Sequence, residues 1–120
     1  MRQKRQYLQY CEKSLNALRS AIASFNSVYD QYKIETTLIL LTNAWELFGK
    51  AILIRAQESI FRNDKQNSSL SAEQVIFKLQ EKKILDENQA VHLQQIVSLR
   101  NEVVHGILPD IILRKGKQSD

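Results

Sequence analysis

The sequence of 120 residues has few of the residues that many catalytic and metal-binding folds require. It contains three Gly, one Pro, one Cys and two His. So few Gly residues exclude the glycine-rich loops that hold phosphates in P-loop and dinucleotide-binding proteins. One Cys and two His cannot supply a four-ligand zinc site within one chain, and a lone Cys excludes a disulfide framework. The single Cys11 fits a reducing compartment, so we expect a cytoplasmic protein.

Long apolar runs and targeting signals are also missing. The longest apolar-leaning stretch without a charge, residues 36–45, is about half a membrane span, so we expect no membrane partner. The basic start of the chain is not followed by the apolar segment of a signal peptide. The length indicates one domain with its own core. The net charge of +4 is compatible with a polyanionic partner but does not establish one.

Apolar periodicity predicts two long helices in the first half of the chain. Apolar residues recur at steps of three and four over residues 3–28, which predicts a helix that packs through one side. That side carries Leu8, Cys11, Leu15, Leu18, Ile22 and Phe25. A second helix over residues 34–61 is apolar around most of its circumference. Such a helix is central, packed against two layers or against one layer and another subunit.

Local motifs predict two further helices. Ser71 and Gln74 form a capping-box pattern after the polar residues 62–71, and the helix that starts there should bury Val75, Ile76 and Leu79. Asp86 should cap a fourth helix that ends at His105, because Gly106 stands at the left-handed exit position and Pro109 prevents resumption.

The predicted fold is therefore all-α, an up-and-down bundle of four to five helices. We expect the bundle to span residues 1–109, followed by a tail of residues 110–120 that begins a further segment or docks elsewhere. Only residues 110–113 have a pattern compatible with a strand.

The fourth predicted helix carries a group of three polar residues, Arg100, Asn101 and His105. At 100° per residue, Arg100 falls near the middle of the apolar face, where a guanidinium is costly unless it is paired. Asn101 and His105 lie one turn apart at the edge of that face. An imidazole titrates near neutral pH, and a position at the end of a helix favours its protonated form.

An anion for Arg100 is available on the second predicted helix. Glu46 lies with Asn43 and Lys50 in a narrow polar sector of an otherwise apolar surface. We interpret this as a pairing of Glu46 with Arg100 across two packed helices. The alternative is a solvent-facing stripe held by a pair between Glu46 and Lys50 at spacing i, i+4.

Residues 100–105, Arg-Asn-Glu-Val-Val-His, resemble the R-N-x-x-x-H signature of the HEPN superfamily. The all-helical domain, over residues 3–108, and the N-x-x-E-x-x-x-K pattern at Asn43, Glu46 and Lys50 are similar to bacterial HEPN families linked to phage defence and toxin systems. The chain looks most like the HEPN-like N-terminal domain of uncharacterised bacterial proteins.

The resemblance implies an endoribonuclease that needs no metal or cofactor. RNA carries its own nucleophile, the 2'-hydroxyl, so the enzyme has to move protons and stabilise charge. In this interpretation Arg100 holds phosphate oxygens, His105 transfers protons and Asn101 orients either the His105 ring or the substrate. HEPN nucleases form homodimers in which two such motifs face one cleft. The implied partners are RNA, a second copy of the chain and a cognate antitoxin.

Two other interpretations remain open at the level of sequence. One is a catalytically silent HEPN-like module that serves dimerisation or RNA binding in a longer protein. The other is a helical bundle with an unrelated interaction role.

Overall fold

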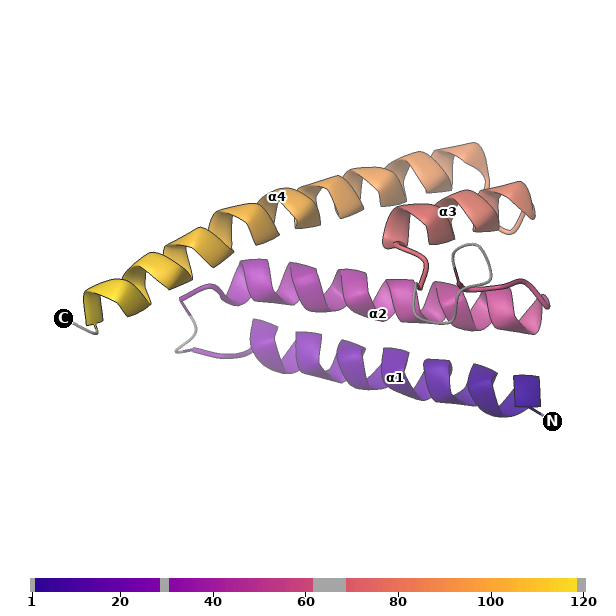
Figure 1. Ribbon diagram of the computed structural model, residues 1–120, viewed down its shortest axis with the longest axis horizontal. Coiled ribbons are helices and arrows are strands. Elements are labelled where there is room, and N and C mark those ends of the chain that lie inside the picture. Colours follow the sequence, from indigo (N-terminus) through magenta and orange to yellow (C-terminus); the bar gives the residue numbers. More distant parts are fainter. Residues whose placement is uncertain (1, 29–30, 62–68, 119–120) are drawn as a thin grey trace.

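The computed structural model describes the backbone of residues 2–28, 31–61 and 69–118, and the side chains of residues 4–28, 31–61 and 69–106. It contains four helices, α1 (Arg2–Phe25), α2 (Lys33–Arg55), α3 (Ala72–Glu81) and α4 (Glu87–Gln118) (Figure 1). The predicted all-α bundle is confirmed. Within the described residues, extended pairing is limited to an isolated bridge between Phe61 and Ser69.

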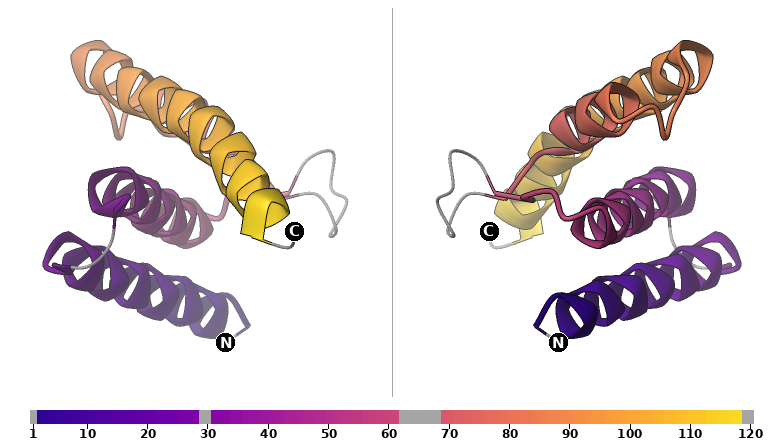
Figure 2. Two further views of the ribbon diagram at one scale, coloured as in Figure 1. Left: turned by 90° about the vertical axis from the view of Figure 1, so that its left-hand side faces the viewer. Right: turned by 90° about the vertical axis from the view of Figure 1, so that its right-hand side faces the viewer.

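The helices form two antiparallel pairs, α1 with α2 and α3 with α4. The two pairs meet at α2, which contacts all three other helices. α1 and α2 lie side by side, and the Ser14 Oγ donates a hydrogen bond of 2.8 Å to the Ala44 carbonyl. α3 and α4 form the second pair on another side of α2, with α3 running in the same direction as α2 (Figures 1 and 2). Among the described residues, α1 contacts α2 but neither α3 nor α4. The central position predicted for the second helix is therefore confirmed.

The helix starts predicted from local motifs are correct. The Ser71 side chain accepts a hydrogen bond from the Gln74 N–H, and the Gln74 side chain accepts one from the Ser71 N–H. Asp86 and Gln89 make the same reciprocal pair, at 2.8 Å and 3.0 Å. Each motif satisfies amide groups that a helix start leaves without an intrahelical acceptor.

The predicted helix ends are less accurate. α2 stops at Arg55, before the expected end at Phe61, and Gln57 then adopts a φ of 63° that no continuing α-helix allows.

The end predicted for the fourth helix is also wrong. α4 continues beyond His105 to Gln118, and no described Gly has a positive φ. Gly106 is thus an interior helical residue, and the helix crosses the boundary expected between residues 1–109 and 110–120. Residues 110–113 are helical rather than extended. Pro109 has no amide hydrogen, so α4 continues through this position with one intrahelical hydrogen bond fewer. The C-terminal end of α4 extends past the other helices (Figure 1).

The core lies where α2, α3 and the first half of α4 meet. A first cluster consists of the buried residues Leu53, Ile54, Ile60, Leu70, Val75 and Leu79. A second consists of Ala72, Ile76, Ala90 and Val97. Trp45 and Leu85 pack against both clusters and so join them. The prediction that the third helix buries Val75, Ile76 and Leu79 is confirmed.

α1 does not pack through the side that its sequence predicts. The contact with α2 uses the buried Ser14 and Ala21, with Tyr7 and Tyr10 against the first core cluster. The small residues allow the two helix backbones to approach closely, and the Ser14 hydroxyl finds a carbonyl acceptor there. The large apolar residues that were expected to be buried are instead 38% to 57% exposed: Leu8, Leu15, Leu18, Ile22 and Phe25.

Of the described helices, α2 alone is long and apolar enough to cross a bilayer, with a mean hydropathy of 1.4 over its most apolar window. Length and composition are the only grounds for that reading. α2 contacts α1, α3 and α4, which is the arrangement of a core helix in a soluble bundle.

Candidate functional site

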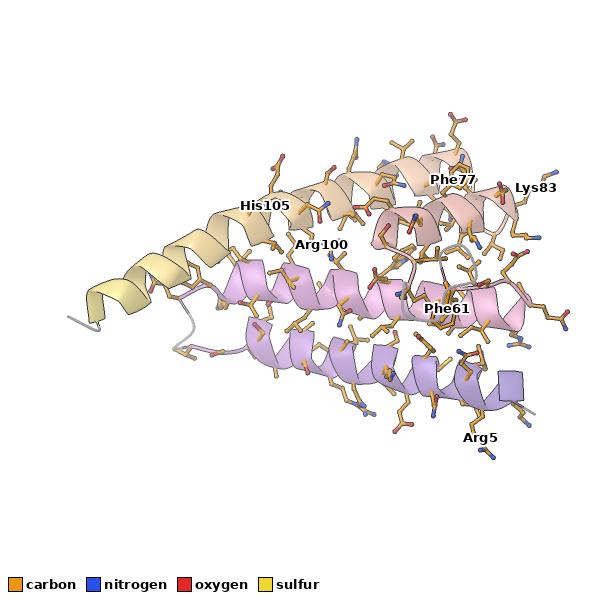
Figure 3. The ribbon with its side chains drawn as sticks, in the orientation of Figure 1. Arg5, Phe61, Phe77, Lys83, Arg100 and His105 are labelled. Carbon is orange, nitrogen blue, oxygen red and sulfur yellow. The ribbon has the colours of Figure 1, made fainter. Side chains whose placement is uncertain are left out.

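The three residues of the Arg-Asn-His constellation lie on α4 beyond the part that α3 covers. Arg100 is partly buried and lies between α4 and α2, whereas Asn101 and His105 are exposed (Figure 3). This agrees with the inward position predicted for Arg100 and the edge positions predicted for the other two. A partly exposed guanidinium can still reach a ligand, which a fully buried one cannot.

A chain of hydrogen bonds links Arg100 to a carboxylate on α3. The Arg100 Nε donates to the Asn101 Oδ1 at 3.0 Å, and the Asn101 Nδ2 donates to the Glu73 Oε1 at 3.1 Å. The bond from Asn101 is the main cause that lowers the pKa of Glu73, and the charge of Arg100 adds to it. Glu73 is therefore ionised at neutral pH, and Asn101 is held between a cation and an anion.

The sequence analysis did not identify Glu73. Glu73 lies in the first turn of α3, and 28 positions separate it from Asn101. α3 and α4 are antiparallel and joined by a short connection, so the start of α3 is expected to lie near the middle of α4. No residue pattern selects Glu73 from its neighbours.

The predicted pairing of Glu46 with Arg100 is wrong. The Glu46 carboxylate lies 4.0 Å from the Lys50 Nζ, and the buried Lys50 also donates a hydrogen bond of 2.5 Å to the Ser69 Oγ. The alternative pair at spacing i, i+4 is thus the one that forms. Because α2 and α4 are antiparallel and Trp45 packs in the cluster that contains Val97, Arg100 lies level with residues before Trp45.

The polar sector of α2 is a structural feature of the α1–α2 pair. Burial lowers the pKa of Lys50, and the charge of Glu46 opposes that shift. Burial also raises the pKa of Tyr10 on α1, and Glu46 raises it further. Asn43 is exposed. Among the described residues, none of these side chains makes a hydrogen bond to Arg100, Asn101 or Glu73.

Replacing Glu46 by Gln should change the free energy of unfolding by less than about 1 kcal/mol, because a pair at 4.0 Å with partial exposure contributes little. Lys50 keeps its bond to Ser69 in this variant, and its pKa should fall further once the Glu46 charge is lost. Urea denaturation measures the first effect, with Glu102→Gln as an exposed control. A loss of several kcal/mol would instead show that Glu46 compensates the charge of the buried Lys50.

His105 occupies a different environment from the one predicted. It lies in the interior of α4 rather than at its last turn, away from the terminal turn in which the helix dipole acts. His105 and Asn101 are four residues apart and so share one side of the helix. Among the described residues, His105 makes no hydrogen bond to the Arg100–Asn101–Glu73 chain.

A shallow groove runs along α3 and α4 toward the hydrogen bonds that link Arg100, Asn101 and Glu73. It has a volume of about 620 Å³ and is lined by polar and apolar residues: Gln80, Val91, Gln94, Gln95, Ser98, Leu99 and Glu102. The Gln94 Nε2 also lies 3.4 Å from the Glu73 carbonyl oxygen, at the start of α3. The groove therefore runs beside the turn of α4 that carries Asn101.

The part of the chain that the structure describes contains no group of three or more His, Cys, Asp or Glu side chains that could hold a metal ion.

Comparison with known proteins places the whole bundle in one family. No curated protein and no solved structure matches the sequence. Residues 9–117 match DUF3644, a family described as a domain of unknown function, and this range includes every candidate residue from Asn43 to His105. The chain therefore belongs to the DUF3644 family.

Proposed function

We propose that this domain is a metal-independent endoribonuclease of the HEPN type, acting in the cytoplasm in a bacterial defence or toxin system. The observation that supports it is that Arg100 and Asn101, joined by a hydrogen bond, lie on the same segment of α4 as the exposed His105. In this proposal RNA is the substrate, two protomers share the site and a cognate antitoxin restrains the activity.

The arrangement suits cleavage by the 2'-hydroxyl of RNA. Asn101 engages the Nε of Arg100, which leaves the terminal guanidinium nitrogens to hold phosphate oxygens as charge develops. The 2'-oxygen attacks the adjacent phosphorus and the bond to the 5'-oxygen breaks. One imidazole takes the proton of the 2'-hydroxyl, and a second gives a proton to the leaving 5'-oxygen. Since one chain offers one such His, the His105 side chains of two protomers would supply the pair.

A silent dimerisation or RNA-binding module is the second candidate, and Glu73 favours it. The Glu73 carboxylate engages the Asn101 amide and brings a negative charge to the place where RNA phosphate would bind. An active enzyme has to keep that charge away from the phosphate, whereas a silent module has no such requirement.

The test incubates the purified protein with labelled RNA in EDTA. We expect cleavage that leaves 2',3'-cyclic phosphate ends, and a fall of about 10²-fold or more in His105→Ala, since a positioned acid or base contributes on that order. His92 is exposed on the same helix, so His92→Ala is the matched control and should cleave as the parent does. Absence of cleavage by a folded parent, or equal cleavage by His105→Ala, would favour the silent module.

A further inference from the structure

The α1–α2 pair leaves one large apolar surface uncovered, which we call the open apolar face. Its residues are Leu8, Leu15, Leu18, Ile22 and Phe25 of α1 and Ile34, Leu41 and Phe48 of α2. Each of these residues is 38% to 67% exposed. The five from α1 form the apolar side of a regular amphipathic pattern, and such a side is normally buried.

The two helices contribute to one continuous surface. A groove of about 580 Å³ between them is lined by Leu15 and Leu18 from α1 and by Leu41 and Phe48 from α2. The contact of Ser14 with Ala44 sets the antiparallel register, so that Phe25 lies near the start of α2, where the Lys33 Nζ is 5.7 Å from the centre of its ring.

The middle of the open apolar face is poor in charge, while cations lie at its two ends: Lys33 beside Phe25, and Lys4 and Arg55 beside Leu8. On a helical wheel the α1 residues of the face fall within an arc of about 100°, and the charged residues between Leu8 and Phe25 fall outside it. Those charged residues are Glu12, Lys13 and Arg19. A surface of this kind offers little to a charged partner such as RNA and favours a partner that is equally apolar.

The size of the face matches a stable interface between proteins. Eight large residues that are about half exposed, each with a full surface of about 200 Å², present about 800 Å². The largest apolar patch on a monomeric protein is typically about 300 to 600 Å², whereas a standard interface buries about 800 Å² on each partner. In the described part of the chain, α3 and α4 contact α2 and each other but not α1, so neither covers the α1 side of this face.

We propose that the open apolar face binds a second copy of this chain, with α1 and α2 of one protomer packed against α1 and α2 of its partner about a two-fold axis. The same patch then meets itself, which needs no charge complementarity. This inference goes beyond the proposed function and does not depend on it, because the face lies on α1 and α2 while the candidate site lies on α3 and α4. A cleft shared by two His105 side chains would require a separate contact along α4.

The test is the mass of the protein in solution at micromolar concentration. We expect light scattering to give twice the chain mass of 13.9 kDa for the parent. Ile22→Lys and Phe48→Lys should each weaken the dimer at least 100-fold and give a monomer with unchanged helical circular dichroism. Phe77 on α3 is 63% exposed and lies outside the face, so Phe77→Lys is the matched control and should remain a dimer. A monomeric parent, or a dimer that only Phe77→Lys disrupts, overturns the proposal.

Modification of Cys11 tests the same surface without a variant, in case the substitutions impair folding. Cys11 lines the groove and is partly exposed. Its rate of reaction with a maleimide should fall as the protein concentration rises through the range of dimerisation, and a rate independent of concentration overturns the proposal. RNA cleavage is scored separately. A dimer that does not cleave RNA contradicts only the proposed function. A monomer that cleaves RNA overturns this inference and also contradicts the sharing of the site by two protomers.

Discussion

Replacing Leu53 by Ala should lower the free energy of unfolding by about 2 to 5 kcal/mol. Leu53 is fully buried and is the residue of α2 around which Ile60, Leu70 and Val75 gather. Truncation removes apolar contacts and leaves a cavity, because α2 and α3 are each held by other neighbours and cannot move inward to fill it. For a domain of this size the total stability is about 5 to 15 kcal/mol, so the variant loses a large share of it.

Urea or thermal denaturation followed by circular dichroism measures this loss. Val91 is about half exposed on α4, so Val91→Ala is the control and should change the stability by less than about 1 kcal/mol. All variants have to be compared at one protein concentration, since self-association would add to the apparent stability. An equal loss in the two variants would show that Leu53 is not in the core.

Features that depend on neighbouring residues could be predicted from the sequence. The starts of α3 and α4 are fixed by hydrogen bonds between residues three positions apart, Ser71 with Gln74 and Asp86 with Gln89. The apolar circumference of α2 likewise indicates its central position, because a helix of that kind has to be covered on several sides. The inward turn of Arg100 and the exposure of Asn101 and His105 follow from helical geometry in the same way.

Features that depend on how two helices are set against each other could not be predicted. Periodicity identifies the apolar side of α1 but not whether this chain or another one covers it, so Leu15 and Ile22 were expected to be buried and are half exposed. The sequence also did not identify Leu53 as a central core residue, because a helix that is apolar around most of its circumference does not show which of its residues is most buried. Glu46 failed as the partner of Arg100 because the register between α2 and α4 is set by packing around Trp45.

Gly49 should tolerate no side chain, although Ala is the better helix former. A Cβ at Gly49 would lie 2.6 Å from the Val75 Cγ1 and 3.4 Å from the Leu79 Cδ1. Val75 is fully buried and has little room to move. Overpacking of this kind costs about 1 to 3 kcal/mol, against a gain of about 1 kcal/mol from helix propensity, so Gly49→Ala should be destabilising overall. In a Val75→Ala background the collision is absent, and the same substitution should be neutral or stabilising.

Gly106→Ala is the matched control, and the sign of its effect also tests the course of α4. No atom lies within 4 Å of a Cβ at Gly106, and its backbone is helical without a positive φ. Ala should therefore stabilise the protein by about 0.5 to 1 kcal/mol, as it does in an exposed helix interior. If the helix ended here with Gly106 in the left-handed conformation, as the sequence suggests, Ala would instead be destabilising by about 1 kcal/mol. Chemical denaturation measures the free energy of unfolding of Gly49→Ala and Gly106→Ala, which should change in opposite directions. The sign for Gly106→Ala also shows whether the segment that carries His105 is the middle of a helix or its end.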